Sequence, residues 1–467
     1  MGILAVLLLC QTLSGSEQEN YLRYLQTVRR VPMYPWGVRP FSVQPTGWLP
    51  LGATLRYNST FPYGYNDGPI WAGKGVTLAA EGGFAWRRGV LSLTIAPAAF
   101  VAQNAPFPVH ADSLTGIDRP QRFGNRAYAR LDPGQSTLRV DWRALTLGAS
   151  SANESWGPAL DFPMILGNNA AGFPHIFLGT THPVALGPIR VHTRLLWGRL
   201  EQSAFSAETL AAGRRYATGI ILDLTTRWVP GLEIGVTRFS HRPSFDGLAM
   251  FRGSESGLRS ANELASAFFR WVLPNSGFEV YGEYGRDDYS ANLRDFVLEP
   301  DHDAGYTVGF RKVVTNGAGT APAFVAIRAE LQNTQLSSIA QGRPWTPFYT
   351  SSYLRQGHTQ LGQVLGSEAA PGGGGSVVAV ESYSPTGRWT WSWTRMIRQQ
   401  RGDPSGNTPD PNGVDVQHAL AVERVQRRGR TEIHASVAGV YELNRNFTYD
   451  AFDVNVVLGI RYDFSVR

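Results

Sequence analysis

Long apolar segments are missing from this sequence. Its 467 residues contain no run of about 18 or more apolar residues, whereas a helix needs about 20 of them to span a membrane. A helical membrane protein is therefore excluded. The wall of a transmembrane β-barrel places an apolar side chain only at every second position, so its average hydropathy resembles that of a soluble protein. The mean hydropathy of −0.19 is compatible with such a wall.

Cysteine is nearly absent. The one cysteine, Cys10, lies in the segment MGILAVLLLCQTLSGS, in which a short apolar run precedes small residues. This pattern is typical of a secretory signal peptide, and we predict residues 1–15 to be one. The rest of the chain has no cysteine, so it can form no disulfide and has no thiolate chemistry.

Lysine is also scarce. Lys74 and Lys312 are the only lysines among 43 basic residues, which leaves 41 arginines, and the net charge is +6. Guanidinium groups bind carboxylates and phosphates through paired hydrogen bonds, so one interpretation is that the protein binds an acidic polymer. A bias in genomic base composition explains the excess equally well. Nucleic acid is not the expected polymer, because no compact basic cluster is interleaved with stacking aromatic residues.

From about Trp48 onward, apolar and polar residues alternate. The clearest case is DVNVVLGIRYDFSV, which places Val454, Val456, Leu458, Ile460 and Tyr462 on one face and Asp453, Asn455, Arg461 and Asp463 on the other. Arginines and carboxylates recur on the polar faces, and aromatics such as Trp197 and Trp228 lie near the strand ends. This combination favours a transmembrane barrel over a soluble β-sandwich.

The connections between the alternating segments also alternate, between long and short. The long ones are 59–75, 103–135, 152–174, 201–214, 241–262, 286–304, 333–376, 399–415 and 443–452; the short ones are 87–89, 141–144, 181–188, 229–231, 274–277, 315–322, 384–387 and 427–430. Nine loops joined by eight turns predict an all-β fold, a transmembrane antiparallel β-barrel of about 18 strands over 48–467, with both termini in the periplasm. The segment 123–131 is placed in a loop in this prediction.

A short helix is predicted before the barrel. Ser16 and Glu19 form a capping box, and Leu22, Leu25 and Val28 follow at helical spacing. Pro32 ends the pattern. We therefore predict a periplasmic helical or plug segment over 16–47.

One strand shows tryptophan at alternate positions. In RWTWSWTRMIR, Trp389, Trp391, Trp393 and Arg395 share one face, whereas Arg388, Thr390, Ser392 and Thr394 share the other. We predict that the tryptophans face lipid. A shift of register by one residue would instead place them in the lumen, where they could stack on sugars.

The stretch NESWGPALDFPMILGNNAAGFPHIFLGT, 153–180, contains the candidate polysaccharide-binding residues. Sugar binding requires aromatic faces together with amides or carboxylates that pair with hydroxyl groups. The residues of these types are Trp156, Asp161, Asn168, Asn169 and His175. The alternative is that glycine and asparagine shape the loop while Trp156 fills its core.

No catalytic or metal site is predicted. The nine histidines are scattered, and no nucleophile-elbow pattern occurs. Two acidic clusters are interpreted as solvated loops, because the first lacks an EF-hand glutamate and the second lacks a further histidine or cysteine. They comprise Asp410, Asn412 and Asp415, and Glu299, Asp301, His302 and Asp303. We therefore predict a protein that is not an enzyme and has no cofactor.

Five segments together resemble the Wzi family of capsule assembly proteins. They are YNDGPIWAGKGVTLAAEGGF at 65–84, IDRPQRFG at 117–124, LDPGQSTLRVDWRALTLGAS at 131–150, NESWGPALDFPMILGNNAAGFPHIF at 153–177 and GHTQLGQVLGS at 357–367. The resemblance implies an 18-stranded outer-membrane barrel with a periplasmic helical segment at its lower mouth. It also implies a lectin-like role, in which capsular or related exopolysaccharide is bound and organised at the cell surface.

Further expectations follow from this resemblance. The partners would be an acidic surface polysaccharide, outer-membrane lipid and the barrel insertion machinery, and the protein would be a monomer in the bacterial outer membrane. The sequence departs from the usual outer-membrane pattern at its end, because Arg467 is last and the final aromatic is Phe464. An alternative function is a porin-like channel for anionic solutes or oligosaccharides, lined by the inward arginines.

Overall fold

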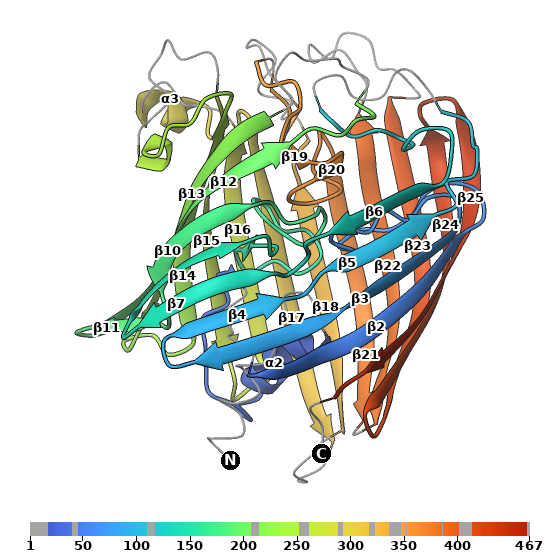
Figure 1. The fold of residues 1–467 in the computed structure, drawn as a ribbon. Helices are drawn as coiled ribbons and strands as arrows, with labels where there is room; N and C mark the ends of the chain where they lie inside the picture. The colour runs from blue at the N-terminus through green and yellow to red at the C-terminus, as the bar shows by residue number, and fades with distance from the viewer. Residues whose placement is uncertain are drawn as a thin grey trace.

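The chain forms a closed antiparallel β-barrel in a computed structural model (Figure 1). The structure describes residues 17–39, 45–109, 117–206, 214–251, 261–287, 293–316, 323–335, 347–351, 353–384, 386–400 and 413–464. Within these residues the wall has 18 strands, three of which are interrupted and carry two labels each. The first strand pairs with the last, since Leu51 lies opposite Tyr462. The predicted fold class and strand number are confirmed.

The strands of the wall follow one another in chain order. They are β2 (Gly47–Asn58), β3 (Gly75–Arg88), β4 (Leu91–Ile95) with β5 (Ala98–Ala102), β6 (Tyr128–Asp132) with β7 (Thr137–Trp142), β8 (Leu145–Ser150), β10 (His175–Thr180) with β11 (Val184–Leu186), β12 (Ile189–Glu201), β13 (Arg214–Thr226), β14 (Leu232–Arg242), β15 (Asn262–Leu273), β16 (Phe278–Asp287), β17 (Ala304–Asn316), β18 (Ala323–Asn333), β21 (Gly374–Ser384), β22 (Gly387–Gln400), β23 (Val414–Arg428), β24 (Thr431–Arg445) and β25 (Tyr449–Tyr462).

The remaining elements lie in the connections or before the barrel. They are α2 (Glu17–Thr27), β1 (Val38–Arg39), β9 (Ser155–Trp156), the short helix η1 (Ala249–Phe251), α3 (Leu293–Leu298), β19 (Thr359–Gln360) and β20 (Gln363–Val364). The predicted helix is confirmed as α2, whereas the predicted signal peptide and Ser16 lie outside the described residues. In the part of the chain that the structure describes, no helix is long and apolar enough to cross a membrane.

The two ends of the barrel differ. Short turns join the strands at one end, which we call the turn end, and nearly all long connections lie at the other, which we call the loop end (Figure 1). This alternation was predicted, but three details were wrong. Residues 128–132 form strand β6 and are not loop, 184–186 form β11 inside a predicted turn, and the connection between β24 and β25 is only 446–448.

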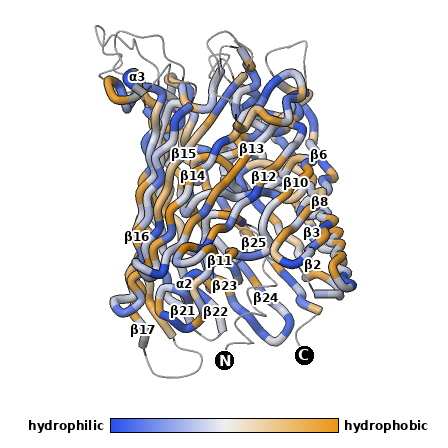
Figure 2. The backbone as a smooth tube through the Cα atoms, turned by 90° about the vertical axis from the view of Figure 1, so that its left-hand side faces the viewer, coloured by the Kyte–Doolittle hydropathy of each residue, from blue (hydrophilic) through white to orange (hydrophobic). Residues whose placement is uncertain are grey.

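The wall has an apolar outer face and a polar inner face. Hydrophilic and hydrophobic residues alternate along its strands (Figure 2). On β22, Trp389 and Trp391 are 41% and 45% exposed, whereas Arg388 and Thr390 are buried in the lumen. The predicted orientation of this strand is therefore confirmed. The alternative register, with the tryptophans in the lumen, is wrong.

Connections from the loop end fold into the lumen and divide it into two halves. Residues from 156–173 and 348–370 pack against the inner faces of β10, β12, β13, β14 and β15 and form the largest apolar core. The other half, beside β17, β18 and β21 to β25, is lined mostly by polar side chains. The barrel is thus packed on one side and hollow on the other.

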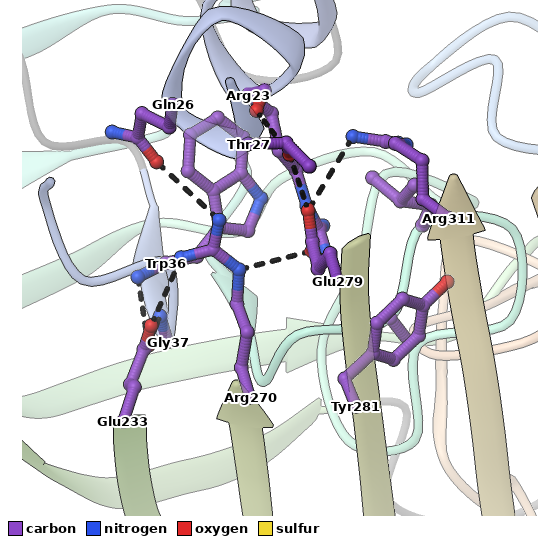
Figure 3. A network of polar contacts seen from close by, with 12 residues as sticks. Arg23, Gln26, Thr27, Trp36, Gly37, Glu233, Arg270, Glu279, Tyr281 and Arg311 are labelled. Atoms are coloured by element: carbon purple, nitrogen blue, oxygen red, sulfur yellow. Dashed lines mark hydrogen bonds and ion pairs between the residues drawn. The ribbon is translucent and has the colours of Figure 1, made fainter. Parts of the chain in front are cut away.

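Helix α2 closes part of the lumen near the turn end through buried ion pairs (Figure 3). Arg23 of α2 donates to Glu279 of β16 from Nε, at 2.7 Å, and from Nη2, at 2.5 Å. Arg270 Nε donates to the same carboxylate at 3.0 Å, and Arg311 Nη1 lies 3.8 Å from it. Thr27 Oγ1 donates to it at 3.1 Å. One buried carboxylate therefore joins the helix to three wall strands.

The chain that follows α2 is held by a second carboxylate. The backbone N–H groups of Trp36 and Gly37 donate to Glu233 Oε1 at 2.7 and 2.5 Å. A side chain at position 37 would not fit, because a Cβ there would lie 2.5 Å from Asp223 Oδ2. Glycine at position 37 therefore permits the close approach of this backbone to side chains of the wall.

Candidate functional site

The stretch that contains the predicted sugar-binding residues folds inward from the loop end. In the lumen, β9 pairs with β1. Trp156 has no exposed surface, and its ring meets Phe239 edge-on at 6.3 Å. A Cβ at Gly219 would lie 2.6 Å from the Trp156 ring, so the indole presses against the backbone of β13. This position matches the alternative interpretation, in which Trp156 fills the core of the loop.

Asp161 forms an ion pair with Arg328 of β18. The backbone N–H groups of Leu160, Asp161 and Phe162 all donate to Glu330, at 2.8, 3.0 and 2.6 Å. A carboxylate of the wall thus fixes this bend of the inward loop, and the Asp161 side chain is 13% exposed in the lumen.

The two adjacent asparagines join three connections to one another. Asn168 Nδ2 donates to the carbonyl of Asn66 at 3.1 Å. Asn169 Oδ1 accepts from the Asn66 N–H at 3.1 Å, while its Nδ2 donates to Val364 O and to Glu368 Oε2, both at 3.1 Å. Each amide therefore already has protein partners.

His175 lies at the start of β10 and is buried. Its Nδ1 is 2.8 Å from the Phe173 carbonyl, and its Nε2 is 3.5 Å from Glu154 Oε1. Burial alone would raise the pKa of Glu154, but Arg194, at 2.6 Å, and His175 hold that pKa below its ordinary value. His175 is thus part of a buried polar cluster in the lumen.

A cavity of about 990 Å³ opens among the connections at the loop end, and we call it the mouth cavity. Its lining combines aromatic rings, amides and paired charges. It includes Tyr63, Tyr65, Asp67, Trp71, Arg119, Gln121, Asn169, Gln363, Glu368, Arg398, Asp415, Glu442, Arg445 and Asn446. Of the five predicted residues, only Asn169 lines it.

The charges of the mouth cavity are largely paired with one another. Glu368 forms ion pairs with Arg119 and, at 3.2 Å, with Arg398. Glu442 forms an ion pair with Arg445 at 2.7 Å and lies 3.9 Å from Arg398. Burial lowers the pKa of Arg119, and Glu368 offsets part of that effect. Arg398 therefore bridges two carboxylates, and its guanidinium spans the cavity wall.

An aromatic cluster borders the mouth cavity. Trp71 is half-buried, and its ring lies 4.8 Å from Phe123 and 6.1 Å from Tyr128. Tyr63 and Tyr65 also line the cavity and are partly exposed. Flat aromatic surface and hydrogen-bonding groups are thus present in one cavity, which is what a sugar ring requires.

A second cavity of about 1330 Å³, the lumen cavity, occupies the hollow half of the barrel. Tyr63 and Tyr65 line both cavities, so the two adjoin at these rings. Its other lining residues include Glu19, Asn20, Tyr24, Arg39, Asp161, Asn168, Arg311, Arg328, Glu381, Arg388, Thr394 and Glu423. Residues of α2 close it toward the turn end.

Among the described residues, more exposed arginines lie around the turn end than around the mouth. Those around the turn end are Arg29, Arg30, Arg87, Arg88, Arg143, Arg190, Arg227, Arg428 and Arg430. In the mouth cavity, by contrast, three arginines face four carboxylates. The arginine excess of the sequence is therefore not an excess of positive charge in this cavity.

The acidic clusters are also placed in part. Within the described residues, no group of three or more histidine, cysteine or acidic side chains is arranged to hold a metal ion. Asp410 and Asn412 lie outside those residues, whereas Asp415 Oδ2 accepts from the Asn446 N–H at 3.0 Å. His302 lies 3.2 Å from Asp303.

Sequence reasoning did not select Trp71, Arg119, Glu368 or Arg398 as site residues. Trp71 and Arg119 lie within the segments that carry the family resemblance, and Glu368 follows the last of them directly. The family resemblance therefore covers or adjoins three of these residues, but no single segment shows that they come together in the fold. Their meeting depends on three inward connections and one strand.

Comparisons with known proteins give a likeness of structure only. No protein-family model matches the chain, and no curated protein matches it. Wzi of Escherichia coli, described as an outer-membrane, carbohydrate-binding β-barrel involved in group 1 capsule assembly, matches with a TM-score of 0.60 and 14% identity, over 90% of this chain and 85% of that one.

Two further matches are weaker. OccAB2 of Acinetobacter baumannii has a TM-score of 0.42 and 11% identity, over 89% of this chain and 98% of that one. OprD of Pseudomonas aeruginosa has a TM-score of 0.41 and 10% identity, over 88% and 92%. The likeness to Wzi establishes that this chain shares the fold of that barrel.

Proposed function

We propose that the protein is a lectin-like barrel of the bacterial outer membrane that binds surface polysaccharide in its mouth cavity. The loop end would face the medium, and the turn end, with α2, would face the periplasm. The apolar outer wall and polar lumen support the membrane location. The similarity of fold to Wzi is compatible with this function.

The mouth cavity is the observation on which the proposal rests. It brings Trp71 and two tyrosines together with amides and charged groups. An aromatic face packs against the C–H groups of a sugar, while planar amides and carboxylates pair with its hydroxyl groups. No bond-forming or bond-breaking step is part of this proposal.

The pairing of charges in the cavity affects which polymer would bind. Arg119 and Arg398 already share Glu368, so an acidic sugar would have to replace that carboxylate or bind beside it. A polymer bound mainly through hydroxyl groups would leave these ion pairs intact. The dependence of binding on salt separates the two cases, because screening weakens only the charged contacts.

The test is retention of the host's purified surface polysaccharide by the detergent-solubilised barrel. Trp71→Ala removes an aromatic face of the mouth cavity and should reduce retention at least several-fold. Trp142→Ala is the matched control, because this tryptophan is 60% exposed at the turn end, far from the cavity. Heat-modifiable migration on a gel reports whether each variant is folded.

Two results would count against the proposal. Equal retention by the Trp71→Ala variant and by the wild type would remove the mouth cavity as the binding site. Failure of the folded wild type to retain any host polysaccharide would refute the lectin-like function itself. Binding that persists at high salt would support the hydroxyl mode, and binding that is lost would support the acidic polymer.

A channel for anionic solutes or oligosaccharides is a second candidate function. The observation that favours it is the contact between the mouth and lumen cavities at Tyr63 and Tyr65. The ion pairs of α2 oppose it, since they close the far side of the lumen cavity. Conductance in planar bilayers distinguishes the candidates, because steady, large single-channel currents would contradict a closed barrel.

A further inference from the structure

The barrel wall is interrupted near the loop end between β6 and β12. Strand β8 ends at Ser150, the chain then enters the lumen, and β10 begins at His175. Strand β6 pairs with β5 on one edge. Among the described residues, no strand pairs with its other edge. Above the ends of β8 and β10, the wall therefore lacks a continuous ladder of backbone hydrogen bonds.

Aromatic side chains fill this break, and we call them the aromatic seam. Phe205, which follows β12, lies 5.8 Å from Phe123 and 5.7 Å from Tyr128 of β6, measured between ring centroids. Gly124 allows the approach, because a Cβ there would lie 2.7 Å from the Phe205 ring. Phe205 is 40% exposed, and Phe123 contacts Trp71 in the mouth cavity. Ring contacts thus connect the outside of the wall with that cavity.

An apolar groove of about 1610 Å³ lies on the outer face of the wall beside the break. It forms because β8 and β10 leave the wall here, so no outward side chains continue their rows. Its banks carry Leu93, Leu138, Ile176 and Trp197, and Tyr216 and Phe245 meet edge-on at 5.9 Å at its loop end. The rest of the outer wall at this level is apolar, so the groove continues the surface that faces hydrocarbon.

Hydroxyl groups beside the groove have hydrogen-bond partners within the protein. Thr137 and Ser150 share a hydrogen bond of 2.7 Å between their hydroxyls. Ser136 Oγ accepts from the Ala96 N–H at 2.9 Å, and Ser151 Oγ donates to the Gly134 carbonyl at 3.0 Å. Backbone and hydroxyl groups at membrane depth need such partners when no water is present. An apolar occupant therefore leaves none of these groups without a hydrogen bond.

The loop end of the groove carries charge. Arg199 lines the groove, and its Nη2 donates to Glu201 at 2.6 Å. Arg214 of β13 lies opposite Glu201 in the register. Two arginines and one carboxylate leave a net positive charge where the apolar groove ends. This arrangement suits an amphiphile with an acyl chain in the groove and a phosphate beside the arginines.

We propose that the groove binds an acyl chain of a membrane glycolipid with a phosphorylated headgroup, and that the sugar part of this lipid reaches the mouth cavity across the aromatic seam. The placement of the sugar part rests on the proposed function, since it assumes that the mouth cavity binds sugar. The bound polysaccharide would then be anchored to a lipid. The barrel would hold such a polymer by both its lipid and its first sugars.

Photo-cross-linking of the full-length protein in lipid nanodiscs tests the groove. One probe is a lipopolysaccharide with a diazirine in an acyl chain, and the other is a phosphatidylethanolamine with the same diazirine. The glycolipid probe should label peptides that contain Ile176 and Trp197 several-fold more than peptides that contain Leu420 and Val437. The last two residues are equally outward but distant, at 68% and 55% exposure.

A matched pair of variants sharpens the test. Ala149→Phe fills the groove, because Ala149 is an outward residue of β8 that lines it. Ala267→Phe introduces the same side chain on the outward face of β15. Labelling at Ile176 and Trp197 should fall several-fold in the first variant and stay unchanged in the second. Heat-modifiable migration confirms that both variants are folded.

The outcomes separate the two proposals. Equal labelling of the groove by both probes, or by the wild type and the Ala149→Phe variant, would overturn the glycolipid site. Retention of lipid-free polysaccharide by the Ala149→Phe variant should be unaffected, since the mouth cavity is intact. If the groove is labelled selectively but no polysaccharide is retained, the lipid site stands and the lectin-like function fails.

Discussion

The buried carboxylate of Glu279 provides the sharpest test of how the barrel is closed. The change is Glu279→Gln, which keeps the side-chain volume and removes the negative charge. In the wild type this carboxylate accepts from Arg23, Arg270 and Thr27, with Arg311 at 3.8 Å (Figure 3). The variant would leave three buried guanidinium groups around a neutral amide.

The expected cost follows from the burial of this network. Arg23 and Glu279 are both fully buried, so solvent does not screen their interaction. Removal of one partner from a buried ion pair costs about 3–5 kcal/mol. Since about 1.4 kcal/mol changes an equilibrium tenfold, the fraction of molecules with α2 undocked should rise by roughly a hundredfold or more.

Limited proteolysis measures this fraction. Arg29 and Arg30 follow α2 and are exposed, but the network on either side of them holds the segment. Cleavage by trypsin at these residues requires the segment to leave its place, and its rate follows the population of the open form when reclosing is fast. The rate should therefore rise by about the same factor as the undocked fraction.

The control is Glu432→Gln, which removes a partly exposed carboxylate paired with Arg427 at the turn end. Such a pair contributes about 0–1 kcal/mol, so cleavage after Arg29 and Arg30 should hardly change. A cleavage rate for Glu279→Gln equal to that of the control would refute the argument that this carboxylate holds α2 in the lumen.

Three further predictions concern the connection between β18 and β21, which contains His358, and the wall. Burial lowers the pKa of His358 to about 4 from 6.5, so its stabilisation of this connection is complete above about pH 6.5 and falls by up to about 3 kcal/mol as the pH drops to 4. Protection factors of the backbone amides in that connection, corrected for the intrinsic pH dependence of exchange, should fall over this range, and equal protection factors at both pH values would contradict the prediction. Gly219→Val should lower stability to urea by about 1–3 kcal/mol because its Cβ meets a buried indole ring at 2.6 Å, whereas Gly439→Val, with no contact below 3.5 Å, should not. Leu420→Arg should make the free energy of folding into vesicles less favourable by about 2–4 kcal/mol. Gln426→Arg, on the same face near the turn end, should cost about 0–1 kcal/mol. Equal losses in the two variants would argue against the assumed membrane depth of these positions.

The architecture of the wall could be predicted because it depends on local pattern. Side chains of a strand alternate between two faces, so the order of Arg388 and Trp389 determines which one enters the lumen once the outer face is apolar. The chain reverses direction after every strand, so successive connections lie at opposite ends of the barrel. Long connections lie at one end and short turns at the other, and the two therefore alternate along the sequence. The predicted length of one connection was wrong. Residues 446–448 form a tight turn, although the surrounding segment has the composition of a loop.

The interior was decided by tertiary contacts. Nothing local to Trp156 shows that Gly219, 63 positions later, leaves space for its ring, so a residue suited to a sugar became part of the core. The arginine excess of the sequence does not make the mouth cavity basic. Glu368 pairs with Arg398, and Glu442 pairs with Arg445. The period-two pattern of the sequence therefore determined a barrel with a polar lumen. Contacts between distant connections decided which polar groups stay open to a ligand, because pairing depends on which segments meet.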